Sequence, residues 1–154
     1  MIEVIKPGPK IELIALRSLE ARLGESLPSS YLSFLLATNG GYSHEYSVPY
    51  IDLALMSEQR AAIFHWLSAC VTKSETGFLG IEEGHRHARG LLPQGVIPIA
   101  VEDGGDPIVL SLRNGDYGSI YLFITESPAN QQMNKLATSF EEFLGKLKLT
   151  RRRA

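Results

Sequence analysis

The chain has 154 residues, the length of one ordinary domain, and its 44% hydrophobic and 21% charged residues are typical of a globular protein. No apolar run approaches the roughly 18 residues of a membrane span, and the N-terminus lacks the pattern of a secretory signal. With one cysteine, Cys70, no internal disulfide can form. We therefore expect a cytoplasmic protein with a core of its own.

The net charge of −2 hides an uneven distribution. Lys148 and Arg151 to Arg153 follow Leu147 with no acidic residue among them. The other 11 basic residues face 17 acidic ones, so the body carries a charge of about −6. This argues against a nucleic-acid reader, which has a basic face. With no apolar run of membrane-spanning length, no membrane partner is expected either. The acidic body suits a basic protein partner or simple solubility.

Two helices are expected near the N-terminus. Leucines recur at helical spacing over residues 13–23, and Gly24 suits the end of that helix. A second helix follows in "LPSSYLSFLLATNGG", where Ser29 or Ser30 can cap its start and Asn39-Gly40-Gly41 can end it.

The middle of the chain, residues 42–92, is harder to assign. Residues 48–53 can form a short edge strand, since Pro49 disfavours the sheet interior. In "SEQRAAIFHWLSACV" the apolar residues from Ile63 to Val71 share one helical face, which predicts a helix over 57–71 capped by Ser57. A turn-rich segment follows, with "FLGI" a candidate strand and the rest an exposed loop.

Residues 96–124 have the pattern of an antiparallel meander. Three apolar runs, 96–101, 108–112 and 120–124, are separated by connections that hold Asp103-Gly104 and Asn114-Gly115. Asp-Gly and Asn-Gly are strong hairpin signals because both turn positions adopt positive φ.

A closing helix follows the meander, because Ser139 and Glu142 have the spacing of a capping box before an amphipathic segment. The order of elements predicts an α+β fold. We expect a single domain over residues 1–147, with a central antiparallel sheet packed against helices from both ends of the chain. Residues 148–154 are expected to be a flexible basic tail.

The stretch "VEDGGD" concentrates charge and is a candidate functional site. Glu102, Asp103 and Asp106 could ligate a hard cation, but their spacing is not that of an EF-hand loop. As a hairpin turn, the same residues need no ligand: the glycines adopt positive φ and the carboxylates stay in water. The turn is favoured, and it leaves these carboxylates free to contact a partner.

Metal and nucleophile chemistry have weaker support. His85 and His87 could ligate zinc with Glu82, Glu83 or His44, but Arg86 and Arg89 disfavour a cation, and an exposed loop is the simpler interpretation. Cys70 could be a nucleophile beside His65, although a buried helical thiol is favoured. No serine-hydrolase elbow, phosphate-binding loop or dinucleotide motif is present. No catalytic residue, metal or cofactor is therefore expected.

A partner-contact surface is the remaining candidate site. Tyr42, Tyr46 and Tyr50 lie in an irregular stretch with Glu45, where aromatic and acidic side chains suit protein contacts. The expected contact set is these four residues with the acidic hairpin residues Glu102, Asp103, Asp106 and Asp116.

Three ordered segments together resemble the SUKH superfamily, which includes bacterial immunity proteins and a fungal regulator of cell-wall synthesis. They are the "LP", tyrosine-helix and "NGG" signature over 27–41, "VIPIA" followed by "DGGD" over 96–106, and "ATSFEEFL" over 137–144. The resemblance implies a non-enzymatic bacterial protein that binds and neutralises a cognate polymorphic or contact-dependent toxin domain in a one-to-one complex. That toxin is often a nuclease or another enzyme that targets nucleic acid, and a nuclease is the expected kind. The resemblance transfers no specific contact residue.

An intracellular scaffold or regulatory module without a toxin, as in the fungal branch, is the alternative function. Neither the identity of the toxin nor the oligomeric state, a monomer or weak homodimer, follows from the sequence.

Overall fold

The computed structural model describes residues 2–72, 80–88 and 90–153, and it confirms the α+β class. Its strands are β1 (Val4–Pro7), β2 (Gly41–Asp52), β3 (Ser57–Trp66), β4 (Val96–Glu102), β5 (Pro107–Ser111), β6 (Ile120–Phe123), β7 (Met133–Ala137) and β8 (Lys148–Arg151). Its helices are α1 (Leu13–Leu23), α2 (Ser29–Ala37), α4 (Ile81–His87), α5 (Phe140–Lys146) and the short 3-10 helix η1 (Ala129–Gln131).

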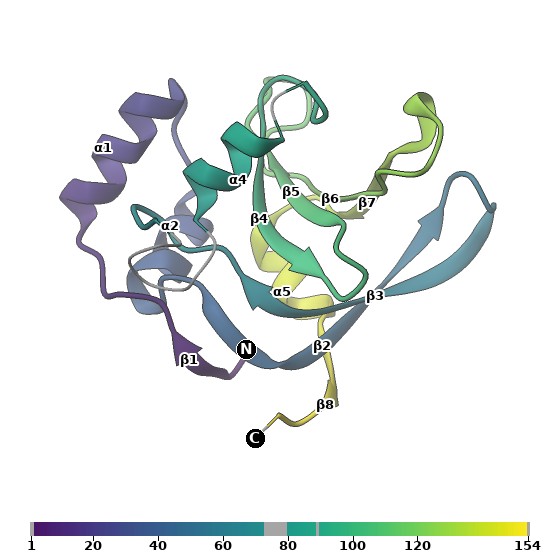
Figure 1. The fold of residues 1–154 in the computed structure, drawn as a ribbon, viewed down its shortest axis with the longest axis horizontal. Coiled ribbons are helices and arrows are strands. Elements are labelled where there is room, and N and C mark those ends of the chain that lie inside the picture. Colours follow the sequence, from purple (N-terminus) through teal and green to yellow (C-terminus); the bar gives the residue numbers. More distant parts are fainter. Residues whose placement is uncertain (1, 73–79, 89, 154) are drawn as a thin grey trace.

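All eight strands belong to one antiparallel sheet, in which β1 to β7 are neighbours in chain order (Figure 1). β3 pairs with β2 from one end of that strand to the other. β1 and β8 must therefore share the opposite edge of β2, where they pair with Gly41–Ser43 and Glu45–Ser47 respectively. The sheet is strongly curved, so that β2 and β7 approach each other although four strands separate them in the sheet. The Leu53 N–H, just beyond β2, donates to Asn134 Oδ1 on β7 at 2.9 Å.

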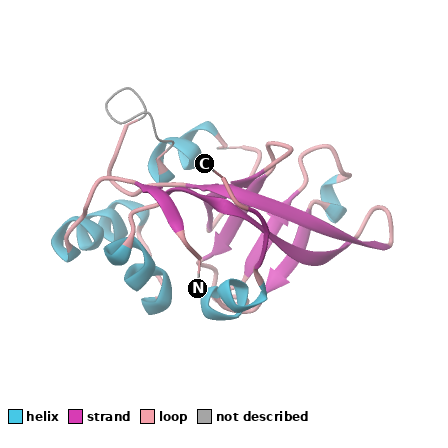
Figure 2. Ribbon diagram, turned by 90° about the horizontal axis from the view of Figure 1, so that it is seen from below, coloured by secondary structure: helices cyan, strands magenta, loops and turns pink. Residues whose placement is uncertain are grey.

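The sheet is apolar on both faces, and Figure 2 shows helices above and below it. Alternation along β5 sends Ile108 and Leu110 into the main core, which also contains residues of α1, α2 and α5. Val109, between them, packs with Phe123 and Val96 in a smaller second cluster. Only part of this second face is covered, because a groove remains between α4 and the sheet.

The three expected strands of the meander are confirmed as β4, β5 and β6, but the turn chemistry differs from expectation. In the first turn Gly105, not Asp103-Gly104, adopts positive φ (99°), and its N–H donates to Glu102 O at 2.9 Å. A turn closed this way and followed by a left-handed glycine makes a three-residue hairpin loop. In the second connection, the positive φ (89°) belongs to Gly118 and not to Asn114-Gly115.

The helix expected over residues 57–71 is wrong, because residues 57–66 form β3. Ala61, Ile63 and Trp66 are its buried residues, at spacings of two and then three. The extra residue lies where the pairing of β3 with β4 shifts register between Ile63 and His65. A β-bulge of this kind breaks strict alternation and makes a strand resemble a helix in sequence.

Other expectations for the middle of the chain also need correction. β2 begins at Gly41, so the stretch expected to be irregular is a long strand. Residues 82–87, expected in an exposed loop, form α4 together with Ile81, which was expected to end the candidate strand "FLGI". Part of the candidate strand "FLGI" lies outside the described residues.

The C-terminal tail differs from the flexible segment that we expected. Lys148–Arg151 form β8, and the Thr150 hydroxyl donates to Glu45 O at 3.2 Å. The physical reason is the open edge of β2, whose backbone groups offer hydrogen bonds to an extended chain.

The helix ends follow the expected signals in part. Gly24 ends α1 in a left-handed conformation (φ 77°), and Ser139 Oγ accepts from the Glu142 N–H at the start of α5. The N-cap of α2 is Pro28, however, and not Ser29 or Ser30. Beyond α2, Gly40 has a φ of 67°, and a Cβ there would lie 2.4 Å from Leu67 O. The chain therefore passes so close to Leu67 that only glycine fits.

Candidate functional site

The acidic hairpin, residues Glu102 to Pro107 between β4 and β5, is fixed by hydrogen bonds to its neighbours. Asp106 Oδ1 accepts from the backbone N–H and the hydroxyl of Thr125 at 3.1 and 3.0 Å. The Asp103 N–H donates to Ala62 O at 2.8 Å, which anchors the hairpin to β3. The Asp103 side chain itself is exposed. The hairpin therefore presents carboxylates on a fixed backbone.

Tyr50, on β2, lies close to this hairpin. Its pKa is raised, first by partial burial and then by the negative charges of Asp52, Glu102 and Asp106. The structure thus brings together one of the three expected tyrosines and two of the expected hairpin carboxylates. The result is an acidic surface with an aromatic ring at its edge.

An apolar groove of about 330 Å³ adjoins the acidic hairpin. One wall is α4 and the residues after it, and the other is formed by β4, β5 and β6; its lining includes Leu91, Pro98, Val101, Pro107 and Phe123. Leu91 is 61% exposed. The hairpin residue Gly105 and Thr125, the partner of Asp106, also line the groove, so it is continuous with the acidic surface.

Close packing of α4 against β4 shapes this groove. A Cβ at Gly84 would lie 3.1 Å from both Leu67 and Pro98, so glycine allows α4 its close approach to the sheet. We did not anticipate the groove from the sequence. The sequence does contain an indication of it: a continuous apolar run such as "VIPIA" is typical of a strand in a sheet that is buried on both sides.

The other expected contact residues on β2 do not join the acidic surface. Tyr46 is only 7% exposed, and its hydroxyl accepts from the Glu3 N–H at 2.7 Å. Tyr42 stacks on His65 with ring centroids 4.6 Å apart. Glu45 is the register partner of Arg151 on β8. The tyrosine-rich stretch therefore contributes to two separate surfaces, at opposite ends of β2.

Asp116 has a structural environment of its own. Its carboxylate accepts hydrogen bonds from Arg113 and from the hydroxyls of Ser111 and Tyr121, the latter two at 2.6 Å. Arg113 first, and the hydroxyl donors after it, hold the pKa of Asp116 well below its usual range. Asp116 thus braces the loop between β5 and β6.

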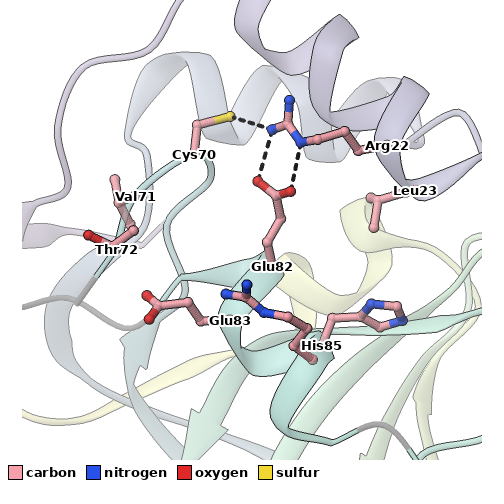
Figure 3. A pocket seen from close by; sticks show the side chains of 9 residues that line it. Arg22, Leu23, Cys70, Val71, Thr72, Glu82, Glu83 and His85 are labelled. Carbon is pink, nitrogen blue, oxygen red and sulfur yellow. Dashed lines mark hydrogen bonds and ion pairs between the residues drawn. The ribbon is translucent and has the colours of Figure 1, made fainter. Parts of the chain in front are cut away.

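Figure 3 shows a different pocket, between α1 and α4. The Arg22 guanidinium makes a bidentate ion pair with Glu82, through Nε–Oε2 and Nη2–Oε1 distances of 2.7 and 2.8 Å. Arg22, mainly through hydrogen bonding, lowers the pKa of Glu82. Cys70 Sγ lies 3.6 Å from Arg22 Nη2. The thiol is exposed and lies outside any helix, which corrects the expected buried helical position.

The histidine pair is placed on α4, where His85 lines the Figure 3 pocket and His87 lines the apolar groove. Within residues 2–72, 80–88 and 90–153, no group of three or more His, Cys, Asp or Glu side chains is arranged to hold a metal ion. In the same residues, no helix is long and apolar enough to cross a membrane.

The fold and this surface define a single α+β domain with an antiparallel sheet and an acidic, partly apolar contact face. Residues 10–146 match the SMI1 / KNR4 family (SUKH-1), and the chain belongs to this family. The family is generally made up of non-enzymatic immunity or regulatory proteins, which suggests a role in protein interaction. No curated protein matches the chain.

Proposed function

We propose that this chain is a non-enzymatic immunity protein that binds and neutralises a cognate toxin domain, with a nuclease as the favoured kind of toxin. The carrying observation is the continuity of the acidic hairpin with the apolar groove on a fixed part of the sheet. Membership of the SUKH-1 family supports the proposal.

The chemistry of this surface favours one kind of occupant. Interfaces are stabilised chiefly by apolar anchors in desolvated pockets, and charge complementarity speeds association. A partner that inserts an apolar side chain beside Leu91 and presents Lys or Arg toward Asp103 would satisfy both features. A nuclease suits this description, because the cleft that holds its nucleic acid is positive.

A scaffold or regulatory module without a toxin is the second candidate. A separate apolar surface favours it: the tip between β2 and β3 carries exposed Leu55 (65%) and Met56 (80%). Met56 also adopts a positive φ of 56°. An exposed, apolar tip of this kind could contact a second protein in an assembly.

The test is co-expression with the C-terminal domain of the product of the adjacent gene. If the proposal holds, this chain restores growth and co-purifies with that domain as a one-to-one complex, measured by light scattering. Asp103→Lys should weaken the complex, while Glu141→Lys, the same charge reversal at an exposed position of α5, should not. Failure to rescue growth or to co-purify would favour the scaffold.

A further inference from the structure

The edge of β3 that faces β4 is covered over only part of its length. β3 pairs with β2 from Ser57 to Trp66, whereas its pairing with β4 begins at Ile63. The last hydrogen bond between this edge and the β4 side runs from the Asp103 N–H to Ala62 O. The β2–β3 hairpin therefore extends past the end of β4, as Figure 1 shows. We call residues 57–61 of β3 the open edge.

The open edge presents a defined set of backbone groups to solvent. The Ala62 carbonyl points toward β4, and the pairing of β2 with β3 has no register shift between Ser57 and Ile63. Because backbone groups alternate along a strand, Glu58 and Arg60 direct their N–H and C=O groups to the same side as Ala62, while Gln59 faces β2. In the described part of the chain, no backbone group bonds to Glu58 or Arg60 on that side. Residues 57–60 are also exposed, so this edge can template another strand.

The side chains of the open edge are complementary to themselves. Glu58 and Arg60 carry opposite charges and flank Gln59 symmetrically. If two copies pair antiparallel with Gln59 opposite Gln59, each Glu58 lies opposite Arg60 of the other copy, and these two residues exchange both backbone hydrogen bonds. A register shifted by two residues in either direction places Glu58 opposite Glu58 or Arg60 opposite Arg60. Charge therefore selects a single register.

The present contacts of the open edge are compatible with this pairing. The Arg60 guanidinium donates to Ser47 Oγ through Nε and Nη2, at 3.1 and 2.9 Å. A carboxylate is a stronger acceptor than a hydroxyl, so Glu58 of a second copy can replace that bond. The new ladder ends where Ser57 lies opposite Ala61, because Ala62 O already accepts from the Asp103 N–H.

We propose that two copies of this chain pair through their open edges and join their sheets across a two-fold axis at Gln59. Such an interface is isologous, since the same residues of both copies meet each other. The symmetric order of Glu58, Gln59 and Arg60 is what identifies a second copy as the occupant. The pairing uses neither the Asp103 carboxylate nor the apolar groove, so it goes beyond the proposed function.

Disulfide cross-linking of the full chain tests the register. In a background that carries Cys70→Ser, a mild oxidant should link Gln59→Cys chains into dimers, because directly opposite residues of this type have Cα atoms about 4.5 Å apart. Ser57→Cys is the matched control, since it is also exposed and lies on the same face of β3. Its two copies would lie about 13 Å apart, at about 3.3 Å per residue, which is too far for a disulfide.

Sedimentation velocity over a range of protein concentrations tests the charge pairs. The wild type should show a monomer–dimer equilibrium. Glu58→Arg and Arg60→Glu should each weaken it about tenfold, because symmetry makes every substitution count twice. The double variant restores both pairs and should dimerise within about threefold of wild type. Glu141→Arg, the same charge change at an exposed position of α5, should have no effect.

The proposal is overturned if the wild type stays monomeric at every concentration, if Ser57→Cys cross-links as readily as Gln59→Cys, or if the folded double variant dimerises no better than the single ones. Circular dichroism shows whether each variant is folded. A monomeric chain whose Glu58 and Arg60 amides are protected from hydrogen exchange only in the toxin complex would reassign the edge to the toxin. All other measurements use the chain alone, so their failure leaves the proposed function untouched.

Discussion

Asn39 and Ala69, thirty residues apart, are joined by two buried hydrogen bonds between one side-chain amide and one backbone unit. Asn39 Oδ1 accepts from the Ala69 N–H at 2.7 Å, and Asn39 Nδ2 donates to Ala69 O at 3.0 Å. Nδ2 also donates to Pro9 O at 2.9 Å. The Asn39 side chain thus links the end of α2 by hydrogen bonds to the segment after β3 and to the segment before α1.

Replacing Asn39 with alanine should therefore destabilise the fold. The change leaves the buried Ala69 N–H and C=O without partners, which should lower the free energy of unfolding by about 2–4 kcal/mol. Urea unfolding measures the difference. Asn130→Ala, at an exposed position of η1, should change it by less than about 0.5 kcal/mol. Equal effects of the two substitutions would show that the Asn39 bonds contribute nothing specific.

Asp103→Lys should slow association with the toxin domain by about tenfold at low salt, because it reverses charge on the surface that attracts a basic partner. Stopped-flow mixing over a range of salt concentrations measures the rate. The difference from wild type should shrink as salt rises. A rate that ignores both the substitution and the salt concentration would remove the acidic hairpin from the interface.

Leu91→Asp should accelerate dissociation of the same complex at least tenfold, since it places a charge beside the apolar anchor site. The variant should fold normally, because Leu91 is largely exposed. Ile14→Asp, at a 77% exposed position of α1, is the matched control and should leave dissociation unchanged. Surface plasmon resonance measures the dissociation rate separately from the association rate. Identical dissociation of both variants would contradict a role for the groove.

Asp116→Asn should destabilise the protein at neutral pH, and by less in acid. The pKa of Asp116 is lower in the folded state, so its carboxylate stabilises the fold above the unfolded pKa of about 3.9. That contribution disappears as pH falls through the folded-state pKa. Because Asp116 is partly exposed, we expect only about 1 kcal/mol at pH 7. Urea unfolding from pH 7 to pH 2.5 should show the wild-type advantage shrinking below pH 4; a constant difference would contradict this assignment.

Cys70 should react completely with a thiol reagent such as DTNB in the folded protein, because its side chain is exposed. The measurement is the absorbance change with and without denaturant. Full reaction without denaturant is the expected result. A thiol that reacts only after unfolding would support the buried position that the helical pattern suggested.

The parts of the fold that the sequence predicted well are those with local chemical signals. Gly24 ends α1 by adopting a conformation that glycine tolerates, and Ser139 caps α5 with its own hydroxyl. The strands of the meander were evident from their apolar runs. β3 was missed because its bulge gives a helix-like spacing from Ile63 to Trp66. β8 was missed because its four residues are all exposed, and only the edge of β2 specifies them.

The candidate site was predictable only in part, for a different reason. Carboxylates beside glycines identified the acidic hairpin from local sequence. Its meeting with Tyr50 and with the groove depends on which strands pair across the sheet, and a single sequence does not state those pairings. Tyr46 illustrates the limit: its type suggested a contact residue, and nothing in the sequence indicated that its hydroxyl accepts from the Glu3 N–H.

β1 and β8 pair with the same edge of β2, and this arrangement affects the order in which the protein folds during synthesis. β1 is made before β2 and can pair with it early, whereas β8 pairs with Glu45 to Ser47 from about a hundred residues further along. At about 5–20 residues per second, translation leaves this part of the strand edge open for several seconds. An open edge invites pairing with other chains. Glu45 and Ser47 are polar, which should limit aggregation of this part of the edge until β8 is synthesised and pairs with it.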